Sequence, residues 1–304
     1  MVRVITVNVR FYEVNSKTAT KTNSASRRSP WTVAWAISWK TLRCGIIAYV
    51  VVLMLLLLFE NRLVYPLEPW DPQVRFGDEA SLQEVYFSAA DGVKLHALYH
   101  SRNRPRVVIL YLHGNGGNIG HRAGLLRFLS SEFEASVLGV SYRGYGKSEG
   151  SPTENGLSLD AEAGLEYLLN KERVKVDRVL IVSRSMGAAV GLRLAIDRCV
   201  PAICIESTFT SLPDVAARQY SWFPVRLLMK NQFSSLSRIS QYRGRLLQSH
   251  GSHDELVPFT MGQELHAAAT CTKEFSVIHN GSHNSPQSGE YYSLIDMLIT
   301  QVYD

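Results

Sequence analysis

The sequence predicts an α/β protein in which a mainly parallel sheet carries helices on both faces and one transmembrane helix precedes the domain. Short apolar runs alternate with segments of helical periodicity from residue 84 to the C-terminus, the pattern typical of parallel sheets. One stretch near the N-terminus, residues 44–59, is apolar and uncharged, as a membrane helix requires. The 304 residues leave room for that helix and one domain of ordinary size.

The N-terminal arm, residues 1–43, is basic. It contains eight lysines and arginines and one acidic residue, Glu13, so the net charge of +5 originates here and the rest of the chain is close to neutral. A nucleic-acid-binding surface is therefore not expected on the domain. Basic residues before an apolar span place the N-terminus in the cytoplasm by the positive-inside rule, which predicts a single-pass protein of an endomembrane or the plasma membrane.

The apolar stretch 44–59 is shorter than the roughly 20 residues of a typical spanning helix. Aromatic side chains suited to the membrane interface flank it: Trp31, Trp35, Trp39, Tyr65 and Trp70. We interpret the stretch as a retained anchor in the lipid bilayer. A cleaved signal peptide is disfavoured by the late position and the absence of an Ala-x-Ala site, and a core helix is the other alternative. Residues 60–81 contain three prolines and predict a linker.

The domain, residues 82–304, is expected to contain eight strands. They cover residues 84–87, 94–100, 107–112, 136–140, 179–182, 202–205, 245–248 and 273–278. Asp91-Gly92 predicts a hairpin turn between the first two. Helices are expected at 122–130, 158–170, directly after Ser185, and at 291–302. Residues 207–243 are irregular and partly helical, which leaves room for a small cap.

A candidate nucleophile lies where the strand at 179–182 meets a helix. The segment Ser183-Arg184-Ser185-Met186-Gly187 turns between them. A serine at such a corner exposes its hydroxyl beside the helix N-terminus, where backbone N–H groups favour an anion. The pattern is close to Gly-x-Ser-x-Gly, with Ser183 at the first glycine position. The alternative is a buried strand that runs into a helix with Ser185 as its N-cap.

A serine hydroxyl needs a base to accept its proton, and the base needs an acid to orient it. In a parallel sheet these groups lie on loops at the carboxyl ends of strands. One such loop offers Asp254, with Glu255 as the nearest competitor, and the loop after the last strand offers His283, with His279 as the alternative. Taken singly, Asp254 could open a surface helix and His283 could be an exposed loop residue. In the chain order Ser, Asp, His, the three form the pattern of a catalytic triad.

A glycine-rich loop, His113-Gly114-Asn115-Gly116-Gly117-Asn118, follows the buried strand at 107–112. Glycines at this place let the backbone approach a substrate and turn its N–H groups toward one point. A phosphate-binding loop is the rival interpretation. It is disfavoured because no Gly-Lys-Ser/Thr follows at P-loop spacing and no Gly-x-Gly-x-x-Gly with an acidic ribose ligand is present.

Taken together, these motifs resemble the α/β-hydrolase superfamily, and within it the membrane-anchored hydrolase-domain proteins that include acyl-protein thioesterases (depalmitoylases) and lysophospholipases. The resemblance extends from about residue 84 to the C-terminus. It is carried by residues 112–118, 142–150, 183–187, 206–210, 251–258 and 281–284.

The resemblance implies roles for individual residues. It implies Ser185 as nucleophile, His283 as base and Asp254 as acid, with an oxyanion hole formed by the backbone N–H groups of Asn115 and Met186. The implied reaction is acyl transfer to water through a covalent acyl-enzyme. This chemistry needs no metal and no cofactor, and the histidines show no metal-ligand spacing.

The expected substrate is a long acyl chain delivered from the bilayer, on an acylated protein or a lysophospholipid. A small cap and a membrane tether favour it. The cap's large apolar side chains are suited to line an acyl groove, and equally suited to pack the cap's own core: Phe209, Tyr220, Trp222, Phe223, Leu227, Leu228 and Phe233. Two alternatives stay open, a serine peptidase of the same fold and a catalytically silent, membrane-tethered binding module.

Overall fold

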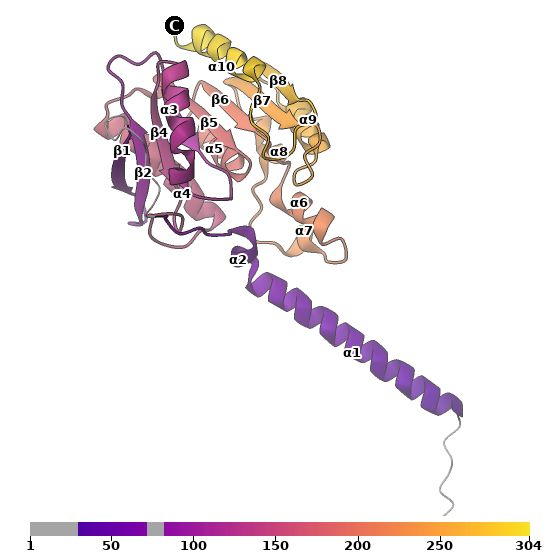
Figure 1. The fold of residues 1–304 in the computed structure, drawn as a ribbon. Helices are drawn as coiled ribbons and strands as arrows, with labels where there is room; N and C mark the ends of the chain where they lie inside the picture. The colour runs from indigo at the N-terminus through magenta and orange to yellow at the C-terminus, as the bar shows by residue number, and fades with distance from the viewer. Residues whose placement is uncertain (1–29, 72–81) are drawn as a thin grey trace, which may run out of the picture. The chain divides into compact units, whose positions relative to one another are not determined.

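The computed structural model describes residues 30–71 and 82–304 (Figure 1). The chain divides into two compact units, Met1–Val52 and Leu53–Asp304. The described residues leave out 1–29, which is most of the predicted basic arm, and 72–81, which is about the second half of the predicted linker.

Helix α1 covers Pro30–Leu58. Its segment Ser38–Leu58 is 21 residues long and apolar enough to cross a membrane. The span thus begins six residues before the predicted start at 44 and includes Lys40 and Arg43. The uncharged stretch alone is shorter than a bilayer core, and long basic side chains near a helix end can extend it because they reach toward the membrane surface.

A second helix, α2 (Glu60–Val64), stands where the sequence predicted the start of a linker. Helical hydrogen bonds continue almost without interruption, since Phe59 N–H donates to Leu55 O at 2.9 Å and Leu63 N–H donates to Phe59 O at 3.0 Å. Tyr65 follows and is buried. The residue before a proline disfavours helical backbone, so Pro66 accounts for the end of α2.

One sheet of eight strands forms the centre of the fold within the described residues, in the order β1-β2-β4-β3-β5-β6-β7-β8. The strands β3 to β8 pair in parallel, and only β1 with β2 and β2 with β4 are antiparallel. This confirms the predicted mainly parallel sheet. The strands are β1 Gln83–Ser88, β2 Lys94–His100, β3 Val108–Leu112, β4 Ser136–Ser141, β5 Val179–Arg184, β6 Ala202–Glu206, β7 Arg245–Gly251 and β8 Lys273–Ile278.

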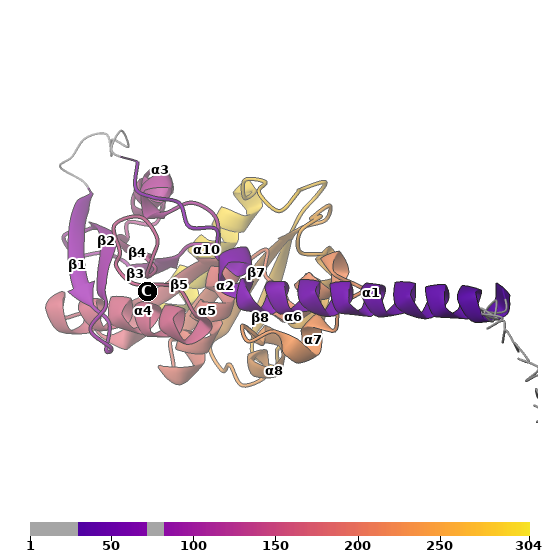
Figure 2. The same ribbon diagram turned by 90° about the horizontal axis from the view of Figure 1, so that it is seen from below.

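Helices cover both faces of this sheet (Figure 2). Alternate side chains of β3 enter two different cores: Leu110 packs on the side of α4 and α5, and Tyr111 packs on the side of α3 and α10. The α-helices after α2 are α3 Ala123–Glu132, α4 Glu154–Glu166, α5 Met186–Asp197, α6 Leu212–Gln219, α7 Val225–Leu228, α8 Ser235–Ile239, α9 Phe259–Ala268 and α10 Gly289–Val302. Short turns of other helix types are η1 Ile119–Arg122, η2 Tyr167–Lys171 and η3 Val176–Arg178.

Helix α4 begins four residues before the predicted start at 158. Thr153 is its N-cap, because its side-chain oxygen accepts a hydrogen bond from Gly156 N–H at 3.0 Å. The cap, and not the apolar periodicity, sets the first turn. At the other end the α-helix stops at Glu166, and η2 covers the remaining predicted helical residues, 167–170.

His96 on β2 is fully buried, and neither of its ring nitrogens has a hydrogen-bond partner within the described residues. Burial lowers its pKa to about 4, with Lys147 acting in the same direction and Glu84 in the opposite one. Between pH 6.5 and 4 the unfolded chain therefore binds a proton that the folded chain does not. Stability contributed at this position is present near neutral pH and falls as the pH drops through that window.

We expect the free energy of unfolding to fall by up to about 1.4 kcal/mol per pH unit for this group below roughly pH 6.5. Replacing His96 with phenylalanine removes the titrating group and two ring nitrogens that lack hydrogen-bond partners within the described residues. His96→Phe should therefore flatten the pH dependence of stability and keep or raise stability at about pH 7. Urea unfolding of the full-length protein in detergent at about pH 7 and about pH 5 measures both. An unchanged difference between the two pH values in His96→Phe would contradict this expectation.

Candidate active site

Ser185 occupies a strained corner between β5 and α5. Its φ of 52° and ψ of −119° are unusual for a residue with a side chain. Two hydrogen bonds hold this strained conformation: Ser185 N–H donates to Glu206 O at 2.7 Å, and the Thr208 side chain donates through Oγ1 to Ser185 O at 3.0 Å. The hydroxyl is thereby fixed above the carboxyl end of the sheet, as the sequence predicted for a nucleophile.

Small residues stand two positions before and two positions after Ser185, at Ser183 and Gly187, and different neighbours restrict their size. At Gly187 a Cβ would lie 2.3 Å from His113 O and 2.4 Å from Leu112 O, so only glycine fits this approach of helix to strand. Ser183, which replaces the usual first glycine, donates its Oγ proton to Cys204 O at 3.0 Å. Room for it comes from Gly191 on α5, where a Cβ would lie only 3.0 Å from Ser183 Oγ.

The three side chains predicted for catalysis lie in one chain of contacts. His283 Nε2 lies 3.2 Å from Ser185 Oγ, and His283 Nδ1 lies 2.7 Å from Asp254 Oδ2. Asp254 follows β7 and His283 follows β8, while Ser185 follows β5, so parallel strands bring the three loops to one edge of the sheet. A hydroxyl, an imidazole and a carboxylate in this geometry can activate the hydroxyl for attack on a carbonyl carbon.

Asp254 is ionised by its surroundings. Burial acts to raise its pKa, but hydrogen bonds from His250, His283 and the Val257 N–H outweigh it and hold the pKa well below its usual range. Its Oδ1 accepts from Leu256 N–H at 3.0 Å and from Val257 N–H at 2.7 Å. A carboxylate can only accept hydrogen bonds, so the proton of neutral His283 belongs on Nδ1, and Nε2 is left to accept the proton of Ser185.

The alternative acid and base are not part of this arrangement. Glu255 and His279 are both exposed, whereas Asp254 is buried. The carboxylate that meets the Nδ1 atom of His283 is that of Asp254, and the imidazole that meets the Oγ atom of Ser185 is that of His283. The structure thus brings together the preferred pair and not its competitors.

Two further residues position the same contacts, and sequence reasoning missed both. His250 is buried, with Nε2 2.8 Å from Val257 O and 3.4 Å from Asp254 Oδ2, so it supports the acid in addition to His283. Arg184 donates through Nη2 to His283 O and, at 3.4 Å, to Asn284 Oδ1. The only signal in the sequence was proximity, since His250 and Arg184 stand in the same motifs as Asp254 and Ser185.

The predicted oxyanion donors lie beside Ser185. Met186 is the first residue of α5, where the backbone N–H has no partner within the helix. The loop of Asn115 passes the nucleophile closely, because a Cβ on Gly114 would lie 3.4 Å from Ser185 Cβ. The Asn115 side chain is held at both ends: Nδ2 donates to Val64 O, and Oδ1 accepts from Tyr145 OH at 2.7 Å.

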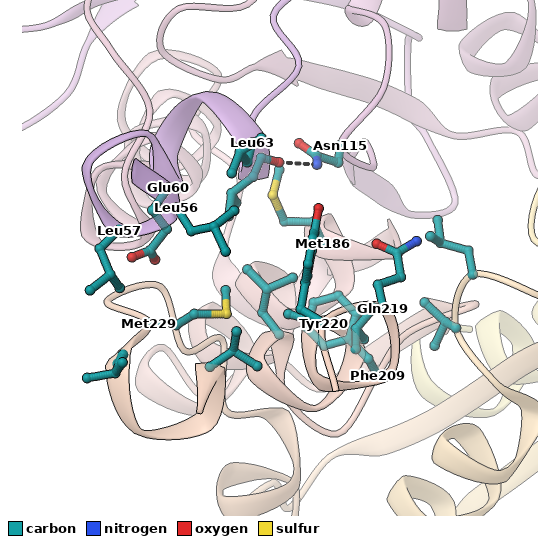
Figure 3. A pocket seen from close by; sticks show the side chains of 18 of the residues that line it. Leu56, Leu57, Glu60, Leu63, Asn115, Met186, Phe209, Gln219, Tyr220 and Met229 are labelled. Carbon is teal, nitrogen blue, oxygen red and sulfur yellow. Dashed lines mark hydrogen bonds between the residues drawn. The ribbon is translucent and has the colours of Figure 1, made fainter. Parts of the chain in front are cut away.

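A cavity of about 240 Å³ opens at Ser185 (Figure 3). Three of the cap side chains predicted to form an acyl groove line it, namely Phe209, Tyr220 and Leu228. The others do not line it. Phe233 is buried in the core, which agrees with the packing alternative, whereas Trp222 and Leu227 are exposed. The opposite wall comes from a part of the chain that the sequence did not suggest, the end of α1 together with α2, through Leu53, Leu56, Leu57, Glu60, Leu63 and Val64.

Comparison with known proteins agrees with the fold. An uncharacterized protein of Mycobacterium tuberculosis is 35% identical over 207 residues, 67% of this chain and 73% of the relative. The lysophosphatidylserine lipase ABHD12 of Danio rerio is 32% identical over 189 residues, 56% of this chain and 49% of the relative. An esterase of Pyrococcus furiosus shares the fold with a TM-score of 0.64 at 20% identity, covering 78% of this chain and 98% of the esterase.

A family sequence model described as alpha/beta hydrolase fold matches residues 107–293, which include Ser185, Asp254 and His283. This match covers more than half of the chain. The chain therefore belongs to the alpha/beta hydrolase fold family.

Proposed function

We propose that this protein is a membrane-anchored serine hydrolase that cleaves acyl esters or thioesters. The observation that carries the proposal is the continuous contact from Ser185 Oγ through His283 to Asp254, at 3.2 Å and 2.7 Å, at one end of a largely apolar cavity. Such a cavity suits an acyl chain and places its carbonyl end at the hydroxyl.

In the proposed reaction Ser185 Oγ attacks the carbonyl carbon while His283 Nε2 takes its proton. The oxygen that gains negative charge is stabilised by the backbone N–H groups of Asn115 and Met186. His283 then returns the proton to the leaving alcohol or thiol, and an acyl-Ser185 ester remains. A water molecule, deprotonated by His283, then attacks this ester. His283 returns that proton to Ser185 Oγ as the bond to the acyl group breaks, which releases the fatty acid and restores the Ser185 hydroxyl.

The proposed substrates are lipids with one acyl chain, such as lysophospholipids, and proteins that carry an acyl group. The apolar cavity wall supports them, as does a lipase among the relatives. The helix at Ser38–Leu58 supports a membrane location, where such substrates are concentrated. With a basic arm before this helix, we propose a cytoplasmic N-terminus and a catalytic domain on the other side of an endomembrane or the plasma membrane.

Substrate profiling of the full-length protein in detergent micelles tests this proposal. We expect hydrolysis of lysophospholipids or acyl thioesters, no cleavage of short peptides, and loss of all turnover after treatment with a fluorophosphonate, which reacts with activated serines. If the protein cleaves peptides but hydrolyses none of the esters or thioesters, it is instead a peptidase. Failure of every substrate together with failure of fluorophosphonate labelling would leave a binding module and would reject the proposal.

A further inference from the structure

The end of α1 presents a regular apolar stripe to the cavity. Leu53, Leu56 and Leu57 are half-buried and line it, whereas the intervening Leu55 and the following Leu58 are exposed, at 46% and 72%. Spacings of three and four residues place the first three on one helix face. Figure 3 shows Leu56 and Leu57 beside Glu60, on the side of the cavity away from Phe209. This stripe belongs to the same helix segment that is apolar enough to span a membrane.

A buried carboxylate fastens this segment to the cap. Glu60 is 6% exposed, and its oxygens accept hydrogen bonds from Lys230 N–H at 3.0 Å and from Asn231 N–H and Nδ2 at 2.8 Å each. Asn231 Oδ1 in turn accepts from Tyr65 OH at 2.6 Å. A carboxylate removed from water is tolerated only when it is satisfied in this way, so the contact defines one fixed arrangement.

The same segment also reaches the oxyanion loop. The last residue of α2, Val64, accepts the side-chain hydrogen bond of Asn115 and itself lines the cavity. Residues 53–64 therefore touch the acyl cavity, the cap and the residue whose backbone N–H is proposed to stabilise the oxyanion.

We propose that the cavity-lining side chains of residues 53–64 are a working part of the active site: the stripe of Leu53, Leu56 and Leu57 forms the acyl-binding wall and selects substrates with a long acyl chain. The inference rests on the proposed function. It makes the membrane helix more than a tether, because the turns that end the apolar span are the turns against which the acyl chain packs. Leu56 and Leu57 are then specificity-determining residues, and Leu55 and Leu58 are not.

A tryptophan scan of four consecutive leucines, Leu55 to Leu58, tests this in the full-length protein in detergent micelles. The ratio of kcat/KM for p-nitrophenyl laurate to that for p-nitrophenyl acetate is measured for each variant. We expect Leu56→Trp and Leu57→Trp to lower the ratio by about tenfold or more, because the indole fills space that the laurate chain needs. The exposed controls Leu55→Trp and Leu58→Trp should keep the wild-type ratio. Fluorophosphonate labelling and acetate hydrolysis report whether each variant is folded.

Binding of the fluorescent fatty acid cis-parinaric acid gives a readout that does not require catalysis. We expect weaker binding in Leu56→Trp and Leu57→Trp and unchanged binding in the two controls. If wild-type protein hydrolyses both esters but the four variants behave alike in the ratio and in binding, the acyl wall is refuted and the proposed function stands. If wild-type protein hydrolyses neither ester while binding still follows the stripe, the proposed function is refuted and the acyl wall stands.

Discussion

Ser185→Ala is expected to lower kcat for ester hydrolysis by about 10⁶-fold, because no acyl-enzyme can form without the hydroxyl. Labelling by a fluorophosphonate should disappear at the same time. The stability of the fold should change little. The hydrogen bonds that hold Ser185 in place, to Glu206 O and from Thr208 Oγ1, involve its backbone and not its side chain. The measurements are steady-state hydrolysis of an acyl thioester and gel-based detection of the labelled protein.

Ser183→Ala is the matched control, two residues earlier in the chain. Its hydroxyl donates to Cys204 O inside the sheet and does not face the cavity. Losing that hydrogen bond should cost about 1 kcal/mol of stability and leave labelling intact. Labelling of Ser185→Ala at the wild-type level would show that another serine carries the reactivity, and the triad would have to be abandoned.

Asp254→Asn is expected to lower kcat by about 10⁴-fold with little change in fold. The Asp254 carboxylate stays ionised because its pKa is held well below the usual range, although burial alone would raise it. An asparagine amide can donate a hydrogen bond to His283 Nδ1. This favours the tautomer with the proton on Nε2 and removes the acceptor that Ser185 needs. Hydrolysis of the same thioester at about pH 7.5 measures the loss.

The neighbouring Glu255→Gln serves as its control, because Glu255 is an exposed acid one residue further along the chain. It removes a similar charge at nearly the same place and should reduce kcat no more than a few-fold. Equal losses in the two variants would indicate a general charge effect in place of a specific role for Asp254. A loss confined to Glu255→Gln would assign the acid to the residue that the sequence offered as its competitor.

Much of this fold was predictable because its central strands are buried on both faces. Each predicted strand begins within one residue of the observed one, and the uninterrupted apolar run at 107–112 is typical of a strand buried on both faces. Helix limits were less accurate, because capping by Thr153 extends α4 beyond its apolar pattern. The nucleophile, acid and base could be named because each follows a strand whose carboxyl end lies at one edge of the sheet.

The cavity walls were less predictable. Cap aromatics such as Trp222 and Phe233 have the right composition, but composition does not say which side of a short helix faces inward. The supports of the triad, His250 and Arg184, depend on where long or ring side chains turn after the backbone has folded. Leu56 lies in a stretch that hydropathy assigns wholly to lipid. Its position in the cavity wall could therefore not be predicted from the apolar pattern.

The hydrogen bond from Asn115 to the Val64 carbonyl has a consequence for evolution and for protein engineering. The match to the family starts at residue 107, yet Val64 and the leucines before it lie well upstream of that boundary. A fragment trimmed to residues 107–293 would lack the hydrogen-bond partner of the Asn115 side chain and one wall of the cavity at Ser185. Exchange of the N-terminal helix between relatives should therefore alter the hydrolysis reaction as well as the membrane in which the protein is found.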